Sequence, residues 1–185
     1  MYLIIGLGNP GIEYEKTRHN MGFQTIDIIS KKYNINLTRQ KFEGIYGEGF
    51  VEKEKVMLLK PQTYMNLSGK CISQFVQFYK IPWENILIIY DDMDILPGTI
   101  KIRKQGGPGS HNGMKSVVQE LNCKEFPRIR IGIGKPENKE EMVSYVIGKV
   151  EKEEWNVLEK GIETAAKAIN DYLINGIDYT MNTYN

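Results

Sequence analysis

The sequence predicts an α/β fold: a single domain, residues 1–185, with a mixed, largely parallel, twisted sheet packed between helices. Strand-like and helix-like segments alternate along the chain, which favours a sheet covered by helices. The run Ile86–Tyr90 is apolar on both faces, as expected of a central strand. A length of 185 residues, without an internal repeat or low-complexity linker, fits one domain.

The first half of the chain supplies three strands and two helices. Tyr2–Gly6 is a short apolar run, which indicates a buried strand. Asn20–Tyr33 has apolar residues at helical spacing. Gly44–Val51 and Val56–Lys60 are predicted strands joined by a charged turn. Ser68–Tyr79 is a predicted helix with an i, i+3, i+4, i+7 apolar pattern.

The second half continues the alternation after Ile86–Tyr90. Ile100–Arg103 is a predicted strand, Gly113–Leu121 a helix and Arg128–Gly132 a strand. A long helix follows near the end of the chain. Its apolar stripe consists of Trp155, Leu158, Ile162, Ala165, Ile169, Tyr172 and Leu173.

Composition limits the classes of function. The net charge of +1 gives no whole-chain affinity for nucleic acid, so a polyanion site has to come from local clustering of charge. The two cysteines, Cys71 and Cys123, form no CxxC motif and suit a reducing compartment. No signal peptide and no membrane-length apolar run is present, so we expect a cytoplasmic protein without a membrane partner.

Polar residues of catalytic type follow the predicted strands. Ligands of open α/β sheets bind beyond the carboxyl ends of the strands, where such residues converge. The residues concerned are Asn9, Tyr64, Asn66, Asp91, His111 and Asn112. For Asn66 and Asn112, capping of the following helix is an equally good explanation.

His19 is the candidate general base. A neutral imidazole is the natural acceptor for a proton from water near pH 7. Asp91 is the best-placed carboxylate to orient it, because it follows the most apolar strand. The plainer alternatives are a structural histidine, a solvated turn acid at Asp91 and a simple N-cap at Asn20.

Two glycine-rich segments bear on ligands. Residues 6–11, GLGNPG, match a dinucleotide fingerprint only in spacing, because the acid about 20 residues later is missing. The segment 106–113 predicts close approach of a ligand or a mobile lid. Beside it, Lys101 with Arg103 and Arg128 with Arg130 form two basic stripes, which are solvated edges or a phosphate-binding patch.

Several chemistries lack their motifs. The chain has no G-x-S-x-G elbow, no P-loop, no H-E-x-x-H and no cysteine cluster, so we expect neither a metal nor a cofactor. General-base attack of water remains, and it suits a reactive ester better than an amide.

Six motifs in order resemble bacterial peptidyl-tRNA hydrolases. They recur between Leu3 and about Gly148 and read GLGNPG, EYEKTRHNMGF, KPQTYMNLSGK, YDDMDILPG, GGPGSHNGMKS and FPRIRIGIGKP. The resemblance implies hydrolysis of the ester between a peptide and the 3′ end of tRNA, which recycles prematurely released peptidyl-tRNA. It also implies a monomer without a cofactor.

The same resemblance implies roles for individual residues. His19 is the base, Asp91 holds it in its basic form, and Asn9 separates N-blocked from free aminoacyl esters. Tyr14, Tyr64, Asn66 and Asn112 are expected to contact the terminal region of the substrate. Arg103 and Arg130 are expected to bind the tRNA 5′ phosphate.

The chain departs from the family pattern at Tyr64, where many relatives have phenylalanine, and at Pro108 and Ser110 of the loop. The alternative to an enzyme is a non-catalytic RNA-binding relative of this family. The presence of His19, Asp91 and both asparagines favours the enzyme.

Overall fold

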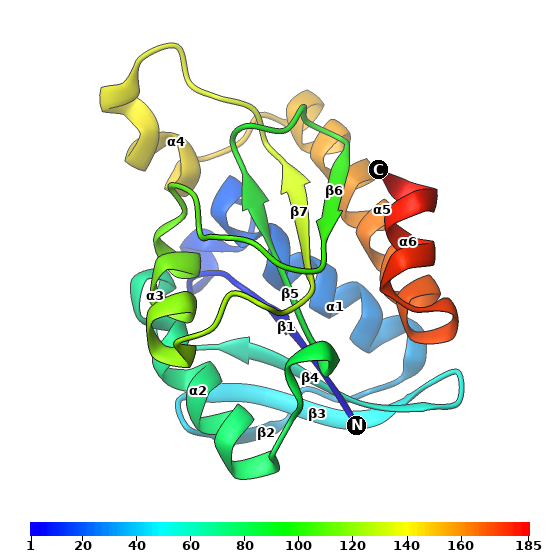
Figure 1. The fold of residues 1–185 in the computed structure, drawn as a ribbon. Helices are drawn as coiled ribbons and strands as arrows, with labels where there is room; N and C mark the ends of the chain where they lie inside the picture. The colour runs from blue at the N-terminus through cyan, green and yellow to red at the C-terminus, as the bar shows by residue number, and fades with distance from the viewer.

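The computed structural model describes residues 1–185 and contains one seven-stranded sheet between two layers of helices (Figure 1). The strand order is β2-β3-β4-β1-β5-β7-β6. In chain order the strands are β1 (Tyr2–Gly6), β2 (Arg39–Lys41), β3 (Gly44–Val51), β4 (Glu54–Pro61), β5 (Ile86–Asp92), β6 (Ile100–Arg103) and β7 (Arg128–Gly132). This is the predicted α/β fold.

The centre of the sheet is parallel and its edges are antiparallel. β1 pairs in parallel with β4 and β5, and β5 pairs in parallel with β7. The hairpin β3–β4, the short strand β2 and the edge strand β6 pair antiparallel. The carboxyl ends of β1, β4, β5 and β7 therefore meet at one edge, where the predicted site residues follow them.

The helices are α1 (Met21–Tyr33), α2 (Ser68–Tyr79), α3 (Asn112–Leu121), α4 (Met142–Ile147), α5 (Lys152–Asn175) and α6 (Ile177–Tyr184). α1 and α5 bury their apolar faces in a core cluster on one side of the sheet. α2 and α3 cover the other side around a second cluster. No helix is both long enough and apolar enough to cross a membrane.

Most predicted elements are confirmed, and the three that were not predicted are polar or short. β2, residues Arg39–Lys41, is a charged edge strand, so no alternating pattern reveals it. α4 and α6 are only six and eight residues long, and their apolar residues are at most partly buried against the core, so neither presents a pattern long enough to predict a helix. β5 extends two residues beyond the predicted end, so that Asp91 belongs to the strand.

Glycines bring the start of α1 unusually close to the sheet. A Cβ added at Gly22 would overlap the carbonyl oxygen of Ile89 and the backbone nitrogen of Leu7, and one at Gly6 would overlap the carbonyl of Gly22. The 3-10 turn η2 (Arg18–Asn20), which directly precedes α1, therefore lies against the carboxyl ends of β1 and β5. Gly11 opens only the short turn η1 (Ile12–Tyr14), not α1, which is unlike a dinucleotide-binding loop.

Candidate active site

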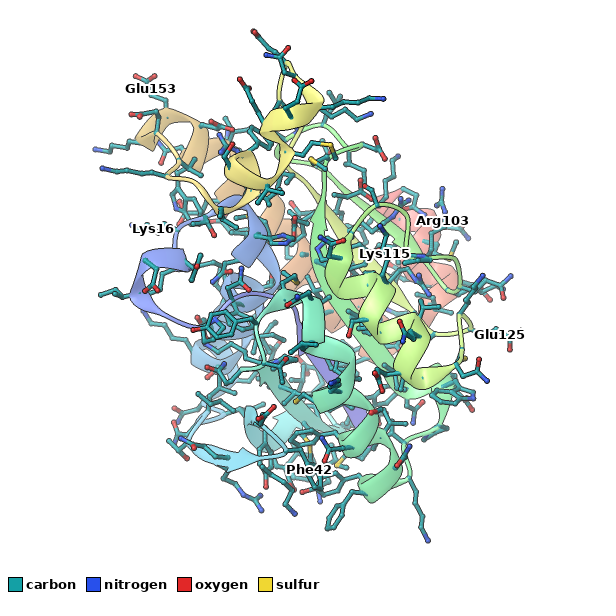
Figure 2. The ribbon with its side chains drawn as sticks, turned by 90° about the vertical axis from the view of Figure 1, so that its left-hand side faces the viewer. Lys16, Phe42, Arg103, Lys115, Glu125 and Glu153 are labelled. Carbon is teal, nitrogen blue, oxygen red and sulfur yellow. The ribbon has the colours of Figure 1, made fainter.

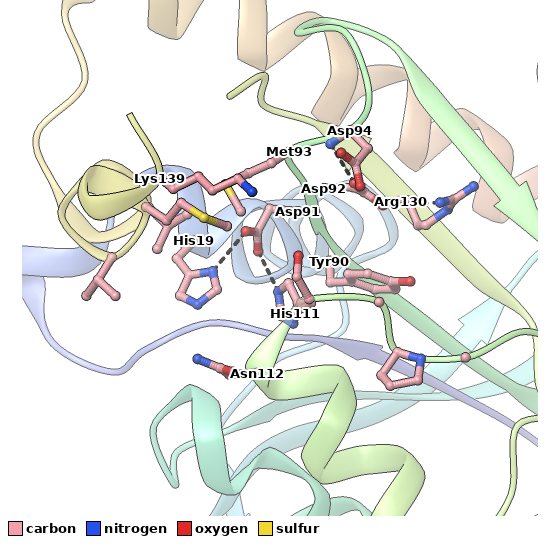
Figure 3. A pocket seen from close by; sticks show the side chains of 17 residues that line it. His19, Tyr90, Asp91, Asp92, Met93, Asp94, His111, Asn112, Arg130 and Lys139 are labelled. Carbon is pink, nitrogen blue, oxygen red and sulfur yellow. Dashed lines mark hydrogen bonds and ion pairs between the residues drawn. The ribbon is translucent and has the colours of Figure 1, made fainter. Parts of the chain in front are cut away.

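One buried carboxylate connects both histidines of the chain. Asp91, near the end of β5, is 2% exposed. Its Oδ2 lies 2.8 Å from His19 Nδ1, and its Oδ1 lies 3.0 Å from His111 Nε2 (Figure 3). The expected contact between His19 and Asp91 is thus present, and a solvated turn acid at Asp91 is excluded.

The hydrogen bonds assign the proton positions on both rings. His111 Nδ1 accepts from the backbone N–H of Met114 at 3.2 Å, so its Nε2 carries the proton donated to Asp91. His19 donates its Nδ1–H to the same carboxylate, which leaves Nε2 unprotonated in the neutral ring. That nitrogen makes no hydrogen bond within the protein. His19 lines the cavity, so Nε2 is available to a water molecule there.

Burial and charge act in opposite directions at this pair. Burial raises the pKa of Asp91, but the charges and hydrogen bonds of His19 and His111 outweigh it and hold that pKa well below its usual range. Burial lowers the pKa of His19, whereas the charge and hydrogen bond of Asp91 raise it, and the net shift is upward from 6.5. Asp91 is therefore the anion that stabilises a protonated His19.

Asn9 and Asn20 form a reciprocal pair next to the histidine. Asn9 N donates to Asn20 Oδ1 at 2.8 Å, and Asn20 Nδ2 donates to Asn9 O at 3.0 Å. Asn20 is the N-cap of α1, but its side chain makes no capping bond, so the simple N-cap alternative is wrong. Asn9 Oδ1 accepts from Met65 N at 2.7 Å, which leaves its Nδ2 as the only unused polar group of the side chain.

A cavity of about 450 Å³ opens at the two histidines. The end of β5, the glycine-rich loop, Arg130 and α4 form its walls. Of the predicted site residues, His19, Asp91, Asn112 and Arg130 line it. Asn9 and Asn20 line a neighbouring groove of about 420 Å³ that runs along α1.

The remaining predicted contacts lie around these openings. Asn66 and Asn112 share a groove between α2 and α3, and neither side chain caps a helix. Tyr64 is 54% exposed and has φ 61° and ψ 162°, a conformation that strains a residue with a side chain. Tyr14 ends η1 and lines neither the cavity nor the Asn9 groove.

The two basic stripes lie on one face of the sheet. In the antiparallel register Lys101 faces Arg130 and Arg103 faces Arg128, so all four side chains share a side. Arg103 is exposed at the outer side of the molecule, away from Lys16 and Glu153 (Figure 2). Arg130 Nη1 donates to Asp92 Oδ2 at 3.2 Å, and its Nε is buried without a partner.

Arg128 is not a free cation, and its inclusion in a phosphate-binding stripe was wrong. It is 2% exposed and donates to the carbonyls of Gly107, Lys124 and Phe126. Buried guanidinium donors satisfy backbone carbonyls that have no other partner. Arg128 therefore anchors the base of the glycine-rich loop, whereas open space surrounds Gly107 and Gly109.

The side chains of His19, Asp91 and His111 lie close enough together to suggest a metal site, with possible ligand atoms within 4.8 Å of one another. A metal on His111 Nε2 requires the proton to move to Nδ1. There it would face the N–H of Met114, which now donates to that atom. The hydrogen-bond pattern fits a carboxylate between two imidazoles and opposes a metal centre.

Comparison with known proteins identifies the family. A family model described as peptidyl-tRNA hydrolase matches residues 3–185. The chain belongs to the peptidyl-tRNA hydrolase family. The match includes the C-terminal helices, beyond the motifs that end near Gly148.

Individual members of the peptidyl-tRNA hydrolase family are similar over the whole chain. A peptidyl-tRNA hydrolase of Clostridium botulinum is 52% identical over 185 residues, which cover 100% of this chain and 97% of that protein. One from Caldanaerobacter subterraneus is also 52% identical, with full coverage of both chains. The crystal structure of peptidyl-tRNA hydrolase from Acinetobacter baumannii has a TM-score of 0.95 at 41% identity, covering 100% of this chain and 94% of that one.

These similarities confirm the expected family and class of enzyme, and they do not favour the non-catalytic alternative. The sequence places His111 near the site without indicating its role, and it leaves Asn20 open to explanation as a simple N-cap. Both are direct neighbours of residues that were singled out, Asn112 and His19. This adjacency is the only feature of the sequence that points to His111 and Asn20, because each makes its defining contact with a residue on a different segment of the chain.

Proposed function

We propose that this protein hydrolyses the ester between a peptide and the 3′ end of tRNA, with His19 as the general base. One observation carries the mechanism. A buried, ionised Asp91 fixes the tautomer of His19 and leaves Nε2 free beside a cavity. The imidazole is thereby oriented, and its charged form is stabilised as the reaction requires.

The reaction needs only water and this pair. His19 Nε2 takes a proton from a water molecule as its oxygen attacks the ester carbonyl. The tetrahedral intermediate collapses, the bond to the ribose oxygen breaks, and the imidazolium returns the proton to that oxygen. The products are a peptide carboxylic acid and a tRNA with a free 3′-terminal hydroxyl. Asp91 stabilises the imidazolium without taking its proton.

Asn9 is proposed to select N-blocked substrates. Its Oδ1 is committed to Met65 N, so only the Nδ2 hydrogens remain for a ligand. A peptide bond or N-acyl group offers a carbonyl that accepts from this amide. The free ammonium of an aminoacyl ester offers only donors, which would oppose the Nδ2 hydrogens.

Other residues are proposed to hold the tRNA. Tyr14, Tyr64, Asn66 and Asn112 are proposed to contact the terminal nucleotides. Asn66 and Asn112 support this proposal, because they have no internal partners and share a groove next to the cavity. Arg103 and Arg130 bind the 5′ phosphate from the edge of the sheet. We propose that the protein acts as a cytoplasmic monomer without a metal.

The test is hydrolysis of N-acetyl-aminoacyl-tRNA by the purified protein in the presence of a chelator, with free aminoacyl-tRNA as the comparison. We expect rapid cleavage of the blocked ester only. His19→Ala should lower the turnover by about 10² to 10⁴, the usual contribution of a general base, while substrate binding persists. Near-normal turnover by His19→Ala would end the general-base mechanism, and no cleavage by the wild type would end the proposed function.

A further inference from the structure

Arg18, which directly precedes His19, is a buried cation that the mechanism above does not use. Apart from the histidines, the buried charged residues are Arg18, Asp91 and Arg128. Asp91 holds His19, and Arg128 holds the glycine-rich loop. Burying a guanidinium is costly unless its donors are satisfied, so the contacts of Arg18 indicate what it holds.

The Arg18 side chain contacts two helices that follow it by more than 120 residues. Its Nε and Nη2 donate to the two carboxylate oxygens of Glu154, at 3.1 and 2.7 Å, which is a bidentate pair. Its Nη1 donates to the carbonyl oxygen of Tyr145 at 2.9 Å. The guanidinium carbon also lies 3.9 Å from the centre of the Tyr145 ring. Arg18 thus binds α4 and the first turn of α5 at once.

α4 has limited support apart from this contact, although Tyr145 and Val146 pack against the core cluster that α1 and α5 also cover. It stands out from the body of the molecule (Figure 1) and buries none of its residues. Its main contacts are with η2, which carries Arg18 and His19, and with the short turn η5 (Lys139–Glu141) that precedes it. The hydroxyl of Tyr145 also donates to the carbonyl of Ile133 after β7, at 2.6 Å.

α4 forms a wall of the cavity that His19 faces. Met142, Val143 and Val146 line that cavity together with His19. The segment before His19 is joined to the segment after α4 by a backbone bridge between Thr17 and Lys149. The position of α4 therefore determines how far the imidazole is shielded from bulk water.

We propose that Arg18 is a positioning residue that clamps α4 against the turn bearing His19 and so closes the cavity around the imidazole. The inference rests on the proposed function only where it concerns turnover. An arginine is required because a lysine cannot form the two-nitrogen fork and stack on Tyr145 at the same time.

The test compares Arg18→Gln and Arg18→Lys with the wild type. With α4 released, kcat should fall roughly ten- to hundred-fold in Arg18→Gln, as for other misplaced catalytic groups, with a smaller change in KM. The kcat of Arg18→Lys should lie between that of the wild type and that of Arg18→Gln. Glu154→Gln removes the half-buried partner of Arg18 and so weakens the same clamp. It provides a second test if the Arg18 variants fail to fold. Each readout should shift in the same direction as in Arg18→Gln, but by less.

Two readouts in the free protein do not require turnover. Amide hydrogen exchange of residues 142–148 should accelerate in Arg18→Gln while that of β1 and β5 is unchanged. The pKa of His19, followed by NMR, should rise, because burial now lowers it and Asp91 remains in place. Arg18→Lys keeps a positive charge beside His19, so a rise in that variant reports the release of α4 and not the loss of a cation. The charged and titratable groups that share the cavity with His19 are retained in the variant: Asp91, Asp92, Asp94, His111, Arg130 and Lys139.

The matched control is Arg39→Gln, which removes a similar arginine from the opposite end of the sheet. Arg39 pairs with Glu48 at 3.0 Å and lies 4.9 Å from the Tyr46 ring, so the same chemistry is lost there. The control should leave kcat, the exchange of α4 and the pKa of His19 unchanged. If α4 exchange in Arg18→Gln matched that of the control, the clamp would be overturned, whatever the wild type hydrolyses.

Discussion

At Asp91, a single carboxylate serves two imidazoles with different tasks. His111 is tied at both ring nitrogens, to Asp91 and to Met114 N, so it can only hold the carboxylate in place. His19 is tied at Nδ1 alone, which leaves Nε2 without a partner in the protein, as the proposed general base requires. A carboxylate with two donors in a buried site stays ionised, and an oriented, ionised partner makes His19 the stronger base.

Asp91→Asn replaces the carboxylate by an amide. It removes the negative charge beside His19 but keeps the His19 side chain itself. Asp91→Asn should reduce turnover less than His19→Ala, because the base remains. It should also move the acid limb of the pH–rate profile to lower pH: Asp91 raises the pKa of His19, so its loss leaves an imidazole that deprotonates at lower pH. The measurement is kcat/KM against pH. Asp178→Asn, at an exposed ion pair with Lys104, is the control, and an acid limb that did not move would show that Asp91 does not act on His19.

At the scale of elements, the site depends on how closely α1 approaches β1 and β5. The contact has no side chain between the helix and the strands, because Gly22 meets the backbone of Leu7 and Ile89 directly. This approach brings the turn Arg18–Asn20 over the strand ends, where Asp91 and Asn9 lie. The GLGNPG and MGF motifs are therefore packing motifs as much as ligand motifs.

A methyl group at Gly22 tests this packing. Gly22→Ala should force α1 away from the sheet and destabilise the protein by about 1 to 3 kcal/mol, the usual cost of overpacking. Urea unfolding would show a lower midpoint with an unchanged m-value. Gly107→Ala is the control for stability, because its Cβ would meet nothing within 4 Å. Equal midpoints for the two variants would contradict the close-packing explanation.

At the scale of the molecule, a nearly neutral chain concentrates cations at one edge of the sheet, as the proposed binding of a polyanion requires. The net charge is +1, yet Lys101, Arg103 and Arg130 share one face at the β6–β7 edge, next to the cavity. Asp92 engages one nitrogen of Arg130 and leaves the rest of its guanidinium without a hydrogen bond. This arrangement supports the proposal that the three cations bind a tRNA phosphate at a fixed distance from the ester.

Substrate length tests the phosphate contact. Arg103→Ala or Arg130→Ala should raise KM for whole peptidyl-tRNA but affect a minimal peptidyl-nucleoside little, because that substrate has no 5′ phosphate. Each lost contact should also flatten the log–log salt dependence of binding by roughly 0.7 to 0.9. Arg39→Ala, on the far edge strand, should change neither. Equal losses on the long and short substrates would assign the arginines to the active site instead of to a phosphate clamp.

The sequence predicts the elements that local interactions determine, and it does not predict those that depend on contacts between distant segments. Ser68–Tyr79 and Ile100–Arg103 were predicted with their observed bounds, since apolar periodicity is local and sets both. β2, α4 and α6 were not predicted, because they bury few residues and are held by contacts with other elements. His19 and Asp91 were paired correctly from their types and from the strand that precedes Asp91.

The sequence by itself determined the alternation of strands and helices, the family, and the residues that carry its motifs. Only the tertiary structure decided that Asp91 is shared with His111, that Arg128 anchors the loop and that Arg18 holds α4. Arg103 and Arg128 pair across two neighbouring strands and look alike in sequence, yet Arg128 is buried and Arg103 is exposed. The reason is that a side chain's role depends on which backbone and charged groups surround it, and those groups come from segments whose proximity only folding creates.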